Sequence, residues 1–246
     1  MIPPHRESDL RKVVITGAAG YFGTVLIPRI LAGGETEEIV GIDLKRPSVG
    51  ERRLRSLALD LRDPKLEEVF RGADAIVHLG YIVAEIRNKR ESHDINIHGT
   101  KNVVTRAARA GVPHIVIASS VAAYGSHPDN PLLIREGDRL RGNLGCYYSY
   151  DKAAVERDLD AAEVKFPELV VTRLRPCTIV GPRASHPLAA LAKRRRVLFP
   201  RGHDPRIQLL YEEDLAEGFY QALRSRRAGA FNLAPDDSLP WIELMH

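Results

Sequence analysis

The chain has 246 residues, of which 44% are hydrophobic and 28% are charged, and its formal net charge is +4. This length and apolar content suffice for one sizeable core, or for one large domain with a small appendage. The mild positive charge is compatible with an anionic ligand and does not demand nucleic acid. The sequence contains no apolar run as long as a membrane span, and its polar N-terminus lacks the apolar core of a signal peptide.

Cys146 and Cys177 are the two cysteines of the sequence, and neither has the spacing of a metal-binding or redox motif. Two such cysteines do not form a disulfide framework, and reduced thiols are typical of cytoplasmic proteins. The loop histidines also lack the spacing of metal ligands. We therefore expect a cytoplasmic protein without a metal site.

The first predicted strand, residues 13–16, leads into three glycines spaced three apart, Gly17, Gly20 and Gly23. Apolar residues then recur at helical spacing, so a helix is expected from Tyr21 onward. A helix N-terminus presents unpaired N–H groups and a partial positive charge, which suit a pyrophosphate. Gly17 then permits the turn, Gly20 the approach of a phosphate, and Gly23 close helix packing. The glycines alone also fit a turn that binds nothing.

A second strand, residues 38–42, ends at Asp43, which follows Gly23 by 20 residues. This is where a dinucleotide-binding fold places the acid that accepts hydrogen bonds from the adenosine ribose. A carboxylate there favours NAD, because it repels the 2′-phosphate of NADP. Lys45 and Arg46 follow directly and keep NADP open as an alternative.

Strands and helices continue to alternate along the chain. Strands are predicted at residues 55–59, 75–79, 114–118 and 169–174, helices at 65–70, 96–110 and 147–164, loops at 45–55 and 128–145, and a loop or helix start at 81–92. Near-continuous apolar strands suit a sheet covered on both faces. The pattern predicts an α/β fold, a Rossmann-type doubly wound parallel sheet.

The pattern changes after residue 182. A basic helix is predicted at residues 188–198, a strand at 207–211, a helix at 213–225, a strand at 230–233 and the start of a helix at 241–246. We expect residues 1–182 to form the cofactor domain, with 207–234 returning to it. Residues 183–206 and 235–246 form a small substrate lobe. Three consecutive arginines, 194–196, without interleaved aromatic residues favour a solvated helix face over a nucleic-acid site.

Tyr148 and Lys152 are four residues apart and share one face of the predicted helix. A free tyrosine is a poor base at neutral pH, and a neighbouring ammonium lowers its pKa by stabilising the tyrosinate. Ser120 follows strand 114–118 at the carboxyl edge of the sheet, where ligands of such folds bind. These three residues suit proton transfer at a hydroxyl coupled to hydride transfer to NAD. Tyr147 is a rival base, but Asp151 four residues on disfavours its ionisation.

The motifs occur in an order that resembles the extended short-chain dehydrogenase/reductases, the NAD-dependent epimerase/dehydratase family. The matching segments are 16–23, Asp43, 60–63, 78–80, 96–102, 119–125, 148–152, 175–176, 181–182 and 211–216. The resemblance implies a catalytic set of Ser120, Tyr148 and Lys152. It implies a cofactor site of Gly17, Gly20, Tyr21, Phe22, Gly23, Asp43, Asp60, Leu61, Leu79, Gly80, Asn96, Ser119, Tyr148, Lys152, Pro176 and Thr178. Substrate contacts are expected from Ser120, Tyr124 and Arg206, and a homodimer through helices 96–110 and 147–164.

Two positions depart from the pattern of nucleotide-sugar enzymes of this family. Thr178 stands where many of them have Asn, and Arg206 is the one candidate for an arginine that grips a diphosphate. The C-terminal lobe is short, which fits either a truncated chain or a compact member. The favoured function is a sugar or nucleotide-sugar epimerase or dehydratase. A net dehydrogenase or reductase of a sugar acid, steroid-like alcohol or aldehyde remains an alternative, as does a non-catalytic NAD-binding sensor.

Overall fold

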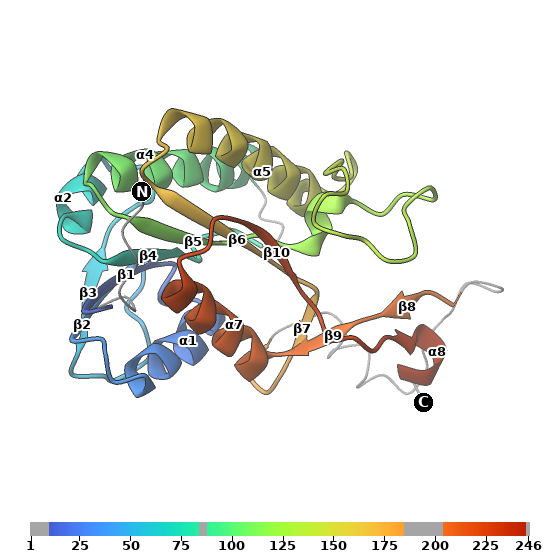
Figure 1. The fold of residues 1–246 in the computed structure, drawn as a ribbon, viewed down its shortest axis with the longest axis horizontal. Helices are drawn as coiled ribbons and strands as arrows, with labels where there is room; N and C mark the ends of the chain where they lie inside the picture. The colour runs from blue at the N-terminus through green and yellow to red at the C-terminus, as the bar shows by residue number, and fades with distance from the viewer. Residues whose placement is uncertain (1–9, 84–87, 185–203, 245–246) are drawn as a thin grey trace, which may run out of the picture.

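A parallel sheet of seven strands lies at the centre of the computed structural model, which describes residues 10–83, 88–184 and 204–244 (Figure 1). The strands are β1 (Lys12–Thr16), β2 (Glu38–Asp43), β3 (Leu54–Ala58), β4 (Ala75–His78), β5 (His114–Ala118), β6 (Val170–Pro176) and β10 (Gly229–Leu233). Their order in space is β10-β6-β5-β4-β1-β2-β3. The order reverses between β1 and β4, and ligands of open α/β sheets bind at such a switch point.

Helices cover both faces of the sheet (Figure 1). On one face lie α1 (Tyr21–Ala32) and α7 (Glu212–Ser225), and on the other lie α2 (Leu66–Phe70), α4 (Thr100–Arg109) and α5 (Tyr147–Lys165). Each face packs its own apolar cluster, which explains why β1, β4 and β5 are apolar on both sides. None of the described helices is long and apolar enough to cross a membrane.

The predicted helix at residues 96–110 differs in its first part. Helix α3 (Lys89–His93) precedes it, and a π-helical turn, η1 (Asp94–Gly99), joins α3 to α4. The Asn88 side chain caps α3 by accepting a hydrogen bond from the Glu91 N–H at 3.3 Å. The helix start expected within residues 81–92 is therefore Lys89, and the helical path is longer than the apolar spacing indicates.

The C-terminal part forms two small sheets beside the main one. Strand β7 (Thr178–Val180) pairs in parallel with β9 (Leu209–Tyr211), and β8 (Arg206–Ile207) pairs antiparallel with β11 (Leu239–Pro240) ahead of α8 (Trp241–Leu244). The prediction of a single strand at 207–211 is thus wrong. It divides at Gln208, whose side chain donates to the Pro235 carbonyl at 2.6 Å. The predicted helix at 188–198, with its three arginines, lies outside the described residues.

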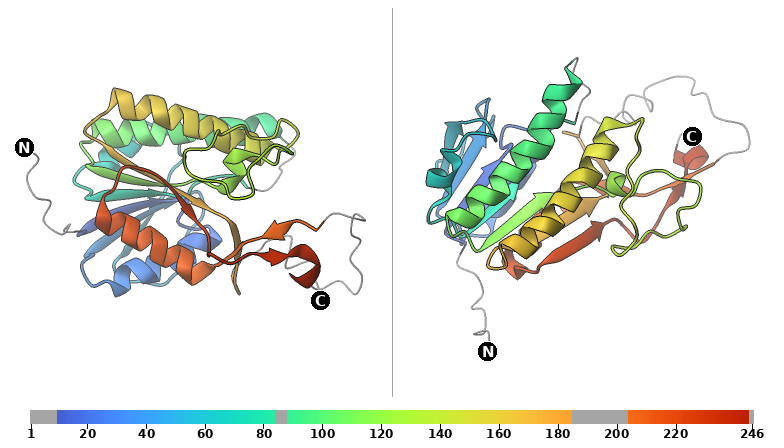
Figure 2. Two further views of the ribbon diagram at one scale, coloured as in Figure 1. Left: turned by 45° about the vertical axis from the view of Figure 1, so that its right-hand side comes forward. Right: turned by 90° about the horizontal axis from the view of Figure 1, so that it is seen from above.

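Helix α7 packs against α1, and β10 extends the main sheet beside β6. Strands β8 and β11 with α8 project from the sheet, as does the segment between η2 (Val121–Tyr124) and α5 (Figure 2). Both projections lie toward the carboxyl ends of the strands. The fold therefore places the least regular parts of the chain at the edge where a ligand is expected.

Candidate active site

The glycine loop after β1 is packed tightly between its neighbours. Gly17 has a φ of +73°, its N–H donates to the Ile42 carbonyl at 2.8 Å, and a Cβ added there would lie 2.5 Å from the Gly80 nitrogen. A Cβ on Gly23 would lie 2.3 Å from the Ala18 oxygen. Neither position tolerates a side chain, because both press on backbone rather than on movable atoms.

Gly20 differs from the other two glycines. Its φ of −65° suits any residue, and an added Cβ would meet only the Gly17 oxygen, at 3.2 Å. Protein packing is therefore looser at Gly20 than at Gly17 or Gly23, and Gly20 lies beside the N-terminus of α1, which has no side-chain cap. Helix N–H groups without a side-chain cap, next to a glycine, form a cradle that fits a phosphate group.

Asp43 closes the other side of this cradle. It ends β2, and its Oδ2 accepts a hydrogen bond from the Ala19 N–H at 3.1 Å, while Oδ1 accepts from the Lys45 N–H at 3.0 Å. The carboxylate thus lies against the glycine loop at the carboxyl edge of the sheet. Its position and the uncapped helix together fit a dinucleotide such as NAD.

Ser120 and Tyr148 meet at the same edge. Ser120 begins the 3₁₀ helix η2 and accepts a hydrogen bond from the Ala122 N–H at 3.1 Å. Ser149 Oγ donates to the Ala122 carbonyl at 2.6 Å and so ties the first turn of α5 to η2. Burial raises the pKa of Tyr148, and a side-chain hydrogen bond with Ser120 partly opposes that rise. Tyr148 is therefore protonated at neutral pH.

Lys152 lies one helical turn after Tyr148 with its side chain directed to the end of β5. It is only 4% exposed, and its Nζ donates to the Ala118 carbonyl at 2.7 Å. Burial lowers the pKa of Lys152 to about 7. The ammonium lies 5.7 Å from the centre of the Tyr148 ring. The structure therefore brings Ser120, Tyr148 and Lys152 together, and Lys152 can change its charge near neutral pH.

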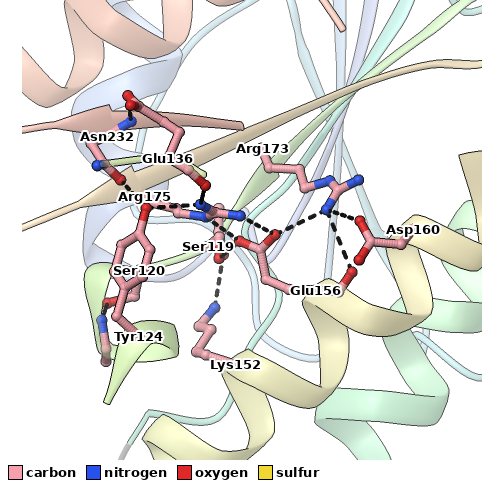
Figure 3. A network of polar contacts seen from close by, with 12 residues as sticks. Ser119, Ser120, Tyr124, Glu136, Lys152, Glu156, Asp160, Arg173, Arg175 and Asn232 are labelled. Carbon is pink, nitrogen blue, oxygen red and sulfur yellow. Dashed lines mark hydrogen bonds and ion pairs between the residues drawn. The ribbon is translucent and has the colours of Figure 1, made fainter. Parts of the chain in front are cut away.

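A buried polar network continues from Lys152 along α5 (Figure 3). Glu156 is 0% exposed, and it accepts hydrogen bonds from Ser119 Oγ at 2.5 Å, from Arg175 at 2.8 and 2.9 Å, and from Arg173 at 3.1 Å. Burial would raise the pKa of Glu156, but hydrogen bonds from Arg175 and Ser119 outweigh burial and lower it. Glu156 is therefore charged and anchors the network, and the Ser119 side chain donates its hydrogen bond to Glu156.

Tyr124 belongs to the same network (Figure 3). Its hydroxyl donates to Asn232 Oδ1 at 2.7 Å and accepts from Arg175 at 2.8 Å, and the residue is only 2% exposed. The expected substrate contact of Tyr124 is thus replaced by a buried link between η2 and β10. The local sequence could not predict this link, because the hydrogen-bond partners of Tyr124 are distant from it in the chain.

Other expected site residues also have protein partners. Asn96 is buried and bonded to both backbone groups of Ile82, Asp60 pairs with Arg62, and Arg206 bonds to Ser238 in the C-terminal lobe. Pro176 and Thr178 lie at the carboxyl end of β6 and the start of β7. Leu61 packs against Gly80, beside Leu79. Among the residues that the structure describes, Arg206 therefore contacts Ser238 and not Tyr148 or Lys152.

Two further residues, Tyr81 and Glu212, were not singled out from the sequence for a role at the site, and Asp151 was considered only for its effect on Tyr147. Tyr81 follows the Leu79-Gly80 pair directly. Asp151, 1% exposed, bonds His93 Nδ1 at 2.7 Å. Glu212 is fully buried at the start of α7 and accepts from the Arg183 N–H at 3.2 Å. An acid between Tyr148 and Lys152 was the signal that could have found Asp151.

A pocket of about 260 Å³ opens beside Tyr148. Its walls come from the segment after β4, from α3 and η1, and from the start of α5: Ile82, Val83, Lys89, Ser92, Asn96, Gly145, Cys146, Tyr147, Tyr148 and Asp151. Polar and apolar groups both line it, so it can accept a ligand carrying hydroxyl groups. Among the described residues no cluster of His, Cys, Asp and Glu is arranged to hold a metal ion.

The sequence model of the NAD dependent epimerase/dehydratase family matches residues 13–234. The chain belongs to this family. The match includes the glycine loop, Asp43, Ser120, Tyr148 and Lys152. The resemblance predicted from the motifs is thereby confirmed, and with it the Rossmann-type fold, membership of a family of enzymes, and NAD as the cofactor of that family.

Individual relatives agree with this placement. An uncharacterised protein of Mycobacterium tuberculosis strain H37Rv is 26% identical over 236 residues, which cover 92% of this chain and 63% of that protein. DesIV, a dTDP-glucose 4,6-dehydratase from Streptomyces venezuelae solved with NAD, superposes with a TM-score of 0.82 at 25% identity, covering 95% of this chain and 79% of DesIV. A UDP-N-acetylglucosamine 4-epimerase from Methanobrevibacter ruminantium M1 superposes with a TM-score of 0.81 at 20% identity, covering 96% and 80%. The chain thus spans less than two thirds of the length of the first relative.

Proposed function

We propose that this chain is an NAD-dependent epimerase or dehydratase that acts on a secondary alcohol of a nucleotide sugar. Ser120, Tyr148 and Lys152 are its catalytic residues. The observation that carries the proposal is the buried Lys152 ammonium, held at the Ala118 carbonyl one helical turn from Tyr148. The nucleotide-sugar substrate is supported by the dehydratase DesIV, whose name specifies dTDP-glucose.

The cofactor site of this proposal is the cradle around Gly20. The N-terminus of α1 receives the pyrophosphate, and Asp43 accepts hydrogen bonds from the adenosine ribose. NAD supplies a hydride acceptor when bound. The buried surroundings of Lys152 keep water away from the reacting groups, which strengthens electrostatic interactions there.

Tyr148 moves the proton of the reacting hydroxyl. Its protonated form can donate to a carbonyl oxygen when the substrate is reduced. For oxidation the tyrosinate is required, and the ammonium of Lys152 is placed to stabilise it. The Ser120 side chain, which opposes the rise in the pKa of Tyr148, can donate a hydrogen bond to the substrate oxygen.

The decisive experiment combines NAD with a substrate panel and the Tyr148→Phe variant. A thermal-shift screen of nucleotide sugars, sugar acids and steroid alcohols identifies the ligand, because binding to the folded state raises its stability. We expect Tyr148→Phe to bind NADH normally and to lose turnover by at least about 100-fold. Tyr150→Phe is the matched control, since the Tyr150 ring stacks against His93 and away from this chemistry.

The outcomes separate the candidate functions. Conversion of a nucleotide sugar without accumulation of NADH supports the epimerase or dehydratase. Steady NADH production from a sugar acid or steroid alcohol indicates the net dehydrogenase instead. Turnover that survives in Tyr148→Phe contradicts the catalytic assignment, and NADH binding without any turnover points to a sensor.

We also propose that α4 and α5 form a homodimer interface. A groove of about 200 Å³ runs between them, lined by apolar residues that include Val104, Leu159 and Phe166 and by the charged residues Lys101, Asp158 and Lys165. Apolar surface between two parallel helices is suited to burial against a second pair. Light scattering at the mass of a single 27.4 kDa chain would remove this part of the proposal.

A further inference from the structure

Tyr81 lies directly over the catalytic lysine. Its ring centre is 3.5 Å from Lys152 Nζ, and the ring meets that of Tyr148 edge to face with centres 5.7 Å apart. A lysine ammonium within about 6 Å of a tyrosine ring face is attracted by the ring quadrupole. Tyr81 thus contacts both members of the Tyr148 and Lys152 pair.

The backbone next to Tyr81 is fixed from the opposite side. Asn96 accepts a hydrogen bond from the Ile82 N–H at 2.8 Å and donates to the Ile82 carbonyl at 3.2 Å. Asn96 also donates to Asp151 on α5 at 3.3 Å, and Asp151 bonds His93. The segment carrying Tyr81 is therefore fastened to the helix that carries Tyr148 and Lys152.

The polar end of Tyr81 does not explain its position. Its hydroxyl is buried and has no hydrogen-bond partner among the described residues. The phenol is held by its ring, which contacts Lys152 and Tyr148 and also packs against the apolar cluster on the α4 and α5 face of the sheet. A buried hydroxyl without a partner is costly, so the ring contacts must compensate for it.

We propose that Tyr81 is a positioning residue whose ring face holds the Lys152 ammonium between the ring and the Ala118 carbonyl. It thereby keeps Lys152 charged and aligned for Tyr148 and for the cofactor. This role rests on the proposed function of Lys152, whereas the contact itself does not.

The charges around Lys152 define what the ring contributes. Asp151 and Glu156 on α5 favour its charged form, and burial opposes it. His78 on β4 is neutral, because burial lowers its pKa to about 3. The ring acts with the two carboxylates, since a cation–π contact stabilises only the ammonium. Removal of the ring while burial is kept must lower the pKa of Lys152 further.

The contact is tested by NMR on protein labelled with ¹³C at the lysine Cε, with the Lys152 signal assigned by Lys152→Arg. We expect an upfield ring-current shift for Lys152 in the wild type and in Tyr81→Phe, which keeps the ring. Tyr81→Leu should abolish that shift and lower the pH at which Lys152 titrates. Tyr147→Leu is the matched control, because the Tyr147 ring covers Lys89 at 4.5 Å and should affect only that lysine.

NADH titration tests the consequence. Tyr81→Leu should weaken NADH binding by about 2- to 30-fold, the range expected from loss of a cation–π contact, and Tyr81→Phe should not. Unchanged NADH affinity in Tyr81→Leu overturns the positioning role. If the Lys152 signal of the wild type shows no ring-current shift, the contact between Tyr81 and Lys152 is refuted. This test needs only the wild type, so it holds even if Tyr81→Leu does not fold. Failure of the wild type to bind NADH refutes the proposed function and leaves the NMR result standing.

Discussion

The three glycines of the loop after β1 should fail in different ways when each is changed to alanine. Gly17→Ala meets two obstacles, a φ of +73° and a backbone nitrogen of Gly80 only 2.5 Å from the new Cβ. Gly20→Ala meets neither, because its φ is −65° and the one neighbour within 4 Å is the Gly17 oxygen at 3.2 Å. If Gly20 is glycine for the sake of a ligand, its substitution should affect binding and spare folding.

The magnitudes follow from these contacts. Left-handed backbone costs about 1–2 kcal/mol for an alanine, and overpacking against rigid neighbours adds about 1–3 kcal/mol. Gly17→Ala should therefore lose about 2–5 kcal/mol of stability. Gly34→Ala isolates the backbone cost, since its φ is +81° and nothing lies within 4 Å of the added Cβ. Gly20→Ala should stay within about 1 kcal/mol of the wild type.

Urea unfolding and NADH titration measure the two effects separately. Gly20→Ala should weaken NADH binding at least tenfold, or about 1.4 kcal/mol, while unfolding like the wild type. Gly50→Ala, which has open space around its Cβ, controls for the substitution itself. Wild-type NADH affinity in Gly20→Ala would refute the phosphate cradle. Equal losses of stability in Gly17→Ala and Gly34→Ala would refute the role given to the contact with Gly80.

Two further predictions concern buried charges. Glu156→Gln should lose roughly 3 kcal/mol, because Arg173 and Arg175 remain buried without their shared carboxylate. Folding lowers the pKa of Glu156, so the stability that its carboxylate contributes is present above the unfolded pKa of about 4.3 and fades as the pH falls below that value. Urea unfolding at several pH values should therefore show the difference in unfolding free energy between the wild type and Glu156→Gln becoming smaller in acid. Lys152 has the opposite balance, because its folded pKa of about 7 lies below its unfolded value of about 10.4. Between these two pKa values the unfolded chain binds one more proton than the folded chain, so the free energy of unfolding of the wild type should rise as the pH rises from about 7 to 10. Lys152→Met should lack this rise. Equal pH dependence of the unfolding free energy in the two proteins would contradict the prediction.

The central sheet was predictable from the sequence because its signals are local. Apolar strands and helical spacing are patterns within single elements, and the glycines and other turn residues that end each element follow it directly in the sequence. The exceptions depend on distant contacts. The strand predicted at 207–211 divides at Gln208 because the residues before it pair with β11 and those after it pair with β7. The helix predicted from Asn96 begins earlier, at Lys89, because Asn88 caps it and a π-helical turn carries the chain into α4.

The candidate site shows the same division. Ser120, Tyr148 and Lys152 lie at one edge of the sheet, since a strand end and a four-residue helical spacing fix them, and their catalytic role stays a prediction. Tyr124 was expected at the substrate, but its hydroxyl bonds Asn232, which is 108 residues away. Tyr81 carried no local signal, because its ring becomes informative only once folding places it over a lysine of another element.

Stability and the proposed catalysis depend on one set of contacts along α5. Tyr148, Lys152 and Glu156 occupy successive turns on one face, and they contact Ser120, Ala118 and Ser119 respectively, at the carboxyl end of β5. Three such contacts fix both the rotation and the translation of the helix relative to the strand. The ion pair of Glu156 with Arg175 is the buried anchor of this arrangement, one turn beyond the reacting groups. A change at Glu156 that leaves the protein folded should therefore loosen Lys152 as well, so under the proposed mechanism Glu156 would affect catalysis by positioning Lys152.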